Sequence, residues 1–213
     1  MDELELLKKD WKKSESSYPK LSYNEIYKLI HKKSSSIVKW IFVIGIGEFL
    51  FWAVLNLLIP ESYLEIYEKL HLKSFLYVTQ AIHYLIIAVF IYLFYKNYKA
   101  ISVTDSTNLL MQKILKTRKT VNYYVYYNIG LYIILSIVIN LIMFSQPDIL
   151  IDVLGSKNEN SIDNSQFLIV MLVAQVITLF VVCGLLWLYY RIVYGILLKR
   201  LYKNYNELEK MDN

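Results

Sequence analysis

The feature that most constrains the fold of this chain is an almost wholly apolar stretch at residues 37–59, which reads IVKWIFVIGIGEFLFWAVLNLLI and ends before Pro60. A helix of this length spans roughly 30 Å, the thickness of the hydrocarbon core of a bilayer. Near its midpoint stands Glu48, an acidic residue where hydrocarbon is expected. The stretch therefore predicts a transmembrane helix with a carboxyl group at mid-membrane depth.

Three further apolar stretches, at residues 75–95, 121–144 and 167–188, have a similar length. Hydrophobic residues make up 56% of the 213 residues and charged residues only 19%, whereas soluble domains carry about 25% charged residues. Glycine (6 residues) and proline (3 residues) are scarce, which argues against a β-barrel with its many turns. The sequence therefore predicts an all-α, integral membrane four-helix bundle.

Helical patterns continue beyond the apolar stretches and predict that the bundle extends out of the membrane. Ser22 and Glu25 form a capping-box pattern, which predicts one nearly continuous helix from residue 23 to residue 59. The third and fourth stretches also run into polar helical segments. The predicted division is cytosolic N-terminal helices at 1–36, a membrane bundle at 37–198 with a cytosolic loop at 96–120, and a cytosolic C-terminal helix at 199–213.

The distribution of basic residues predicts how the chain lies across the membrane. Lysine and arginine number 19 in segments 1–36, 96–120 and 189–213 together, but only 3 in the alternate loops 60–74 and 145–166. By the positive-inside rule, both termini and the loop at 96–120 then lie in the cytoplasm. We expect a multi-pass protein of the bacterial inner (plasma) membrane. In it the first apolar stretch stays as a signal anchor, and each outer loop forms a short amphipathic helix.

Several classes of function are disfavoured by the residue types present. Cys183 is the single cysteine, so an intrachain disulfide and a cysteine metal cluster are excluded. His31, His71 and His83 fall at three predicted depths and cannot share one metal ion. No HExxH, GxSxG or phosphate-binding glycine loop occurs. The net charge of +5 is explained by flanks that face anionic lipid headgroups. We therefore expect no cofactor, no metal, no nucleic-acid partner and no enzymatic activity.

Polar residues inside the apolar stretches are the candidate functional residues, because such groups are costly in a membrane and face the bundle interior or water. Their positions predict a polar layer at one depth, made of Glu48, Gln80, His83, Ser136, Gln175 and Thr178. One interpretation is a proton- or ligand-responsive site with Glu48 and His83 as a titratable pair. The other is a set of interhelical hydrogen bonds that fixes the register or holds a homodimer. The sequence leaves both open.

Two segments, LLKKDWKK…YPKLSYNEIYKLIHKKSSSIVKWIF and SVTDSTNLLMQKILKTRKTVNYYVYYN, resemble a family of uncharacterised four-span membrane proteins of Bacteroidota-type bacteria. Members sometimes bear a beta-carotene 15,15'-monooxygenase label. That label implies several membrane histidines around iron, and this sequence has one, His83. We therefore do not adopt it. The resemblance also implies genes near alternative sigma factors, which would fit membrane-linked regulation.

The predicted architecture favours a regulatory or scaffold role. Three spans continue into the cytoplasm as helices, whereas the outer loops are short, so the larger interaction surface is expected inside the cell. The leading hypothesis is a protein embedded in the lipid bilayer that binds a cytosolic regulatory protein. The alternative is a small transporter or proton-coupled membrane sensor that uses Glu48 and His83. Four spans are few for a transporter, so that alternative requires a homo-oligomer.

Overall fold

The computed structural model describes residues 22–60, 64–104, 106–154 and 164–212. Within these ranges the regular structure is helical and contains no strand. The helices are α2 (Tyr23–Leu57), α3 (Glu65–Lys69), α4 (Lys73–Ser102), α5 (Thr107–Ser145), α6 (Pro147–Leu154) and α7 (Asn164–Asp212). The predicted all-α class is confirmed. The helix predicted near the N-terminus falls in residues 1–21, outside the described residues.

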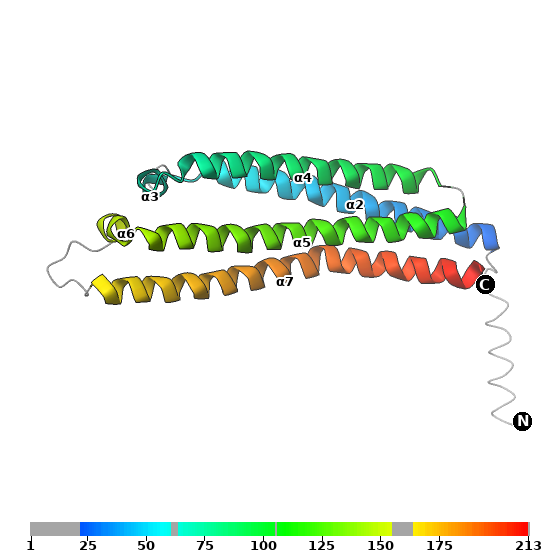
Figure 1. The fold of residues 1–213 in the computed structure, drawn as a ribbon. Helices are drawn as coiled ribbons and strands as arrows, with labels where there is room; N and C mark the ends of the chain where they lie inside the picture. The colour runs from blue at the N-terminus through cyan, green and yellow to red at the C-terminus, as the bar shows by residue number, and fades with distance from the viewer. Residues whose placement is uncertain (1–21, 61–63, 105, 155–163, 213) are drawn as a thin grey trace, which may run out of the picture.

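The four long helices form an up-and-down bundle (Figure 1). Helix α2 packs against α4 and α7, and α5 packs against the same two helices, so the four close a ring around one axis. The end at which α2 begins and α7 ends is called the proximal end below. The end that carries α3 and α6 is called the distal end. Short connections between sequential neighbours favour this antiparallel arrangement.

Each of the four long helices is long and apolar enough to cross a membrane. In the most apolar window of each helix, the buried share is 22% in α2, 6% in α4 and in α5, and 0% in α7. Large apolar side chains point outward instead, such as Phe180, which is 72% exposed. Water would face a continuous apolar surface here, which soluble proteins avoid. The fold is therefore compatible with a multi-pass membrane protein.

Helix α2 begins at the predicted capping box. The Ser22 hydroxyl accepts from the Glu25 backbone N–H at 3.3 Å, and the Ser22 backbone N–H donates to the Glu25 carboxylate at 2.8 Å. These bonds satisfy helix-terminal groups that would otherwise have no partner. Hydrogen bonds from the Ser22 backbone and side chain lower the pKa of the Glu25 carboxyl below its usual value. The helix then continues without a break to Leu57, close to the predicted end at residue 59.

The proximal end has a closely packed core of its own. Its buried apolar residues come from all four long helices and are Ile30, Val38, Ile101, Leu110, Met111, Ile114, Leu201 and Leu208. The fully buried Ser34 hydroxyl accepts from the Asn204 amide at 2.9 Å, which ties α2 to α7 inside this core. At about 1.5 Å per residue, α7 is about 73 Å long, more than twice a hydrocarbon core. The bundle therefore extends as packed helices well beyond the membrane-spanning length.

The distal end is closed by the two short helices that were predicted in the loops. Ile66 of α3 and Leu70, which follows α3, pack with Leu150 of α6 and Met143 of α5. A salt bridge of 3.3 Å joins Lys69 to Asp152 on the surface between α3 and α6. Exposed ion pairs of this kind contribute little to stability, so the apolar contacts hold these helices against the bundle.

Helix α2 packs closely against Phe94 of α4 at Gly45. A Cβ atom placed on Gly45 would lie 3.1 Å from the Phe94 ring, whereas one placed on Gly47 would meet nothing within 4 Å. Phe94 itself is fully buried. A side chain at Gly45 would therefore require the Phe94 ring to shift, whereas one at Gly47 would not.

We expect Gly45→Leu to lower the free energy of unfolding by about 1–3 kcal/mol, because the added side chain displaces Phe94 from a filled core. Gly47→Leu is the matched control, with the same change two residues away on an exposed part of the same helix. Thermal unfolding of both variants in detergent, followed by circular dichroism, measures the difference. Equal melting temperatures for the two variants would show that the Gly45 contact does not matter.

Candidate functional site

A buried carboxyl group held by two tyrosines lies in the middle of the bundle. Glu48 of α2 is 7% exposed. Its Oε1 accepts a hydrogen bond from the Tyr190 hydroxyl at 2.8 Å, and its Oε2 accepts one from the Tyr194 hydroxyl at 2.9 Å. The two tyrosines are four residues apart on α7, so they lie on one face and can reach the same carboxyl. A buried charged or polar group is tolerated only with such partners.

Aromatic rings surround this carboxyl and bind three helices together. Tyr124 of α5 is 2% exposed, and its ring meets those of Tyr190 and Tyr194 edge-on, with centroids 6.1 Å and 5.8 Å away. Phe94 of α4 packs against Tyr124 with its centroid at 5.4 Å. Edge-to-face pairs of this kind contribute about 0.5–1.5 kcal/mol each beyond their buried area.

His83 lies beside this arrangement but binds a different residue. Its Nδ1 is 3.3 Å from the Tyr127 hydroxyl, and the two rings stack with centroids 5.8 Å apart and an angle of 18°. Glu48 and His83, the titratable pair of one of the two interpretations, therefore share no direct hydrogen bond, and each has its own partners. The reason is that Glu48 faces α7, whereas the His83 ring lies flat against α5.

A small void connects the two groups. It has a volume of about 20 Å³, and both Glu48 and His83 line it, with Tyr124 and Asn128 among its other walls. A void needs about 10–15 Å³ and two to four polar partners to hold one water molecule. This void meets both requirements, so a single water molecule could hydrogen-bond to both Glu48 and His83.

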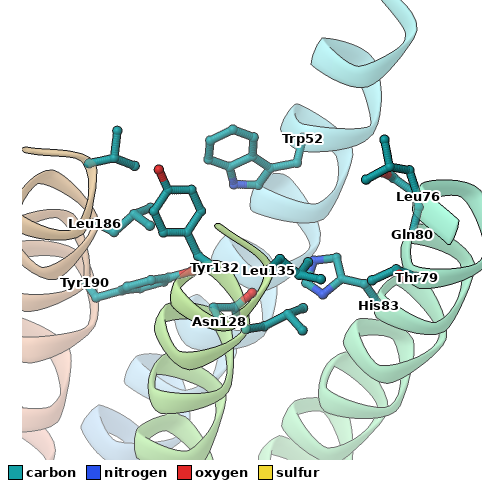
Figure 2. A pocket seen from close by; sticks show the side chains of 12 residues that line it. Trp52, Leu76, Thr79, Gln80, His83, Asn128, Tyr132, Leu135, Leu186 and Tyr190 are labelled. Carbon is teal, nitrogen blue, oxygen red and sulfur yellow. The ribbon is translucent and has the colours of Figure 1, made fainter. Parts of the chain in front are cut away.

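A much larger cavity opens on the distal side of the void (Figure 2). Its volume is about 490 Å³, and all four long helices contribute to it. The lining residues are Trp52, Leu76, Thr79, Gln80, His83, Asn128, Leu131, Tyr132, Leu135, Val182, Leu186 and Tyr190. Trp52, His83 and Asn128 line both the cavity and the void. The two spaces therefore adjoin, and together they reach Glu48.

The predicted polar layer is only partly brought together. Glu48, Gln80 and His83 line the cavity or the void, whereas Ser136, Gln175 and Thr178 line neither. Thr178 is exposed on the surface of α7, and its hydroxyl donates to the Ala174 carbonyl of its own helix at 2.8 Å. It therefore needs no partner on another helix.

The remaining two members of the predicted layer lie outside the cavity as well. The Ser136 carbonyl accepts from the Asn140 amide at 2.7 Å on the same helix. Gln175 Oε1 and Asn140 Oδ1 are buried without a hydrogen-bond partner among the described residues. They lie on α7 and α5, two helices that pack side by side. These polar groups belong to helix packing rather than to the space around Glu48.

Sequence reasoning missed the partners of Glu48. The fourth apolar stretch was expected to end at residue 188, just before Tyr190. The spacing of Tyr190 and Tyr194 by four residues was the signal that could have identified them, because it places two hydroxyl groups on one helix face. Within the described ranges, no group of three or more His, Cys, Asp or Glu side chains could hold a metal ion.

The chain was compared with known protein families, curated proteins and solved structures. A family model described as Domain of unknown function (DUF8845) matches residues 24–213. No curated protein and no solved structure matches the chain. The match agrees with the expected resemblance to an uncharacterised family, whereas the bacterial group that the resemblance implied stays a prediction.

We expect Tyr194→Phe to lower the free energy of unfolding by about 1–3 kcal/mol, because it leaves a buried carboxyl oxygen without its donor while keeping the ring. Tyr189→Phe is the control, since this neighbouring residue is 39% exposed and donates no hydrogen bond to Glu48. In the Glu48→Leu background, Tyr194→Phe should lower the free energy of unfolding by less, because the carboxyl group that the hydroxyl binds is no longer there. Melting temperatures in detergent measure all four variants, and an undiminished effect in that background would contradict the assignment.

Proposed function

We propose that the chain, which belongs to the family described as Domain of unknown function (DUF8845), is an integral membrane protein with a regulatory or scaffold role. In this proposal the proximal end lies in the cytoplasm and binds a regulatory protein there. The observation that carries the proposal is the packed core of the proximal end, which continues the bundle beyond the length that a membrane requires. No catalytic step is part of the proposed role.

The proposed orientation rests on the basic side chains of the proximal end. Those exposed on the described helices include Lys28, Lys32, Lys33, Lys39, Lys96, Lys99, Lys116, Lys119, Lys199, Arg200, Lys203 and Lys210. The positive-inside rule assigns such a face to the cytoplasm, in keeping with a bacterial inner membrane. A basic surface also favours an acidic partner, because complementary charge accelerates and orients association.

The second candidate is a proton-coupled membrane sensor or small oligomeric transporter that uses Glu48 and His83. The cavity and the void support it, because they reach Glu48 from the distal half of the bundle. On the proximal side of Glu48, the fully buried Phe94 and Val121 fill the bundle. This packing favours sensing over passage of a solute through one chain. The exposed apolar faces of the helices could contact a second copy of the chain, as an oligomeric transporter requires.

The orientation can be tested with single-cysteine variants, because Cys183 is the only cysteine in the sequence. In a Cys183→Ser background, Lys203→Cys places a thiol on the proximal end and Glu68→Cys places one on the distal end. A membrane-impermeant maleimide added to spheroplasts should label Glu68→Cys and leave Lys203→Cys unlabelled until lysis. The reverse pattern would invert the proposed topology.

The partner can be tested by crosslinking in living cells. A photo-crosslinking amino acid at Tyr202, exposed on the proximal end, should capture one specific cytosolic protein, whereas the same probe at Tyr67 on the distal end should not. Lys32→Glu with Lys33→Glu should weaken binding of the captured protein about tenfold through lost charge complementarity. Lys32→Arg with Lys33→Arg is the matched control. Capture at both ends, or equal binding by both double variants, would contradict the proposal.

A further inference from the structure

We propose that the cavity on the distal side of Glu48 binds a neutral, membrane-soluble compound with a planar ring that carries carbonyl oxygens, the chemistry of a lipid quinone. This inference goes beyond the proposed function and does not depend on a cytosolic partner. The cavity volume of about 490 Å³ is typical of small-molecule sites, which span roughly 300–1,000 Å³. It is large enough for a substituted ring together with part of an apolar chain.

The residues that line the cavity indicate that its ligand is uncharged. Among the described residues, no Asp, Glu, Lys or Arg side chain lines the cavity. A phosphate or ammonium group would therefore enter without a counter-charge, at a large desolvation cost. Leucine and valine side chains form much of the wall, and these favour an apolar body. The site thus selects neutral molecules and disfavours phospholipid headgroups.

The polar groups of the wall select for oxygen acceptors. The Asn128 amide donates one N–H to the Tyr124 carbonyl at 2.8 Å and keeps a second N–H. The Nδ1 atom of His83 is hydrogen-bonded to the Tyr127 hydroxyl, which leaves Nε2 available to a ligand. Among the described residues, the Gln80 amide has no protein hydrogen-bond partner. A purely hydrocarbon occupant would leave these groups unpaired, which costs about 1–3 kcal/mol for each.

Aromatic side chains make the site suited to a ring. Trp52 and Tyr132 project their rings into the same space, and the Tyr190 ring forms part of the wall beside α7 (Figure 2). Stacked or edge-on contacts with a bound ring stabilise it beyond the burial of its area. The Trp52 indole is 48% exposed without a ligand, so an occupant would cover apolar surface that the protein itself leaves open.

Binding can be measured through Trp52. The full chain with Trp11, Trp40 and Trp187 each changed to Phe keeps Trp52 as its only tryptophan. In nanodiscs of phosphatidylethanolamine and phosphatidylglycerol, decylubiquinone should quench Trp52 fluorescence saturably. Decylbenzene has a ring and a chain but no carbonyl, and it should not compete. Quenching that rises linearly with quinone, or equal competition by decylbenzene, would overturn the proposal.

Two variants localise the binding. Gln80→Leu should weaken quinone binding roughly tenfold, the loss expected for one buried hydrogen bond. Leu135→Trp, read by displacement of a radiolabelled quinone, should abolish binding by filling the cavity. Leu141→Trp on the lipid-facing side of the same helix, where Leu141 is 68% exposed, is the matched control. If Leu135→Trp unfolds, Gln80→Leu alone decides, and unchanged affinity in that variant refutes the site.

Discussion

The middle of this bundle depends on one interaction, the acceptance of two tyrosine hydroxyls by the Glu48 carboxyl. Removing an acidic group from water is expensive, and the hydrogen bonds offset that expense only if both tyrosines stay in place. They stay in place because Tyr124 of α5 packs its ring against both of them, and Phe94 of α4 packs against Tyr124. Gly45 in turn lets Phe94 approach α2. One polar contact thus fixes the relative positions of all four long helices.

The packing differs between the two ends of the bundle. Proximal to Glu48, buried residues from four helices leave little free space, as the fully buried Ile41 and Val121 illustrate. Distal to it, the helices enclose a cavity whose walls combine leucine with uncharged polar groups. A filled half resists deformation, whereas a half with a cavity can change its packing when the space is occupied. Glu48 lies at the boundary between the two.

Much of the fold could be predicted from the sequence, because length and apolarity identify membrane-spanning helices and the capping box at Ser22 identifies the start of α2. The candidate site was harder to predict from the sequence. Helical spacing shows which residues share a face on one helix, but not which face meets a neighbour. Thr178 shows this, since it lies three residues from Gln175 and yet is exposed. Glu48 was identified because a carboxyl group is conspicuous in an apolar stretch, whereas tyrosines are ordinary there.

The continuity of α7 has a mechanical consequence. This helix is unbroken from Asn164 to Asp212, so Tyr190 and Leu208 belong to one stiff rod and lie about 27 Å apart along it. A tilt of about 5° with its pivot at Tyr190 would move the rod near Leu208 by about 2 Å. Leu208 belongs to the proximal core. A change in the tilt of α7 at Tyr190 would therefore shift this helix more in the proximal core than beside Glu48.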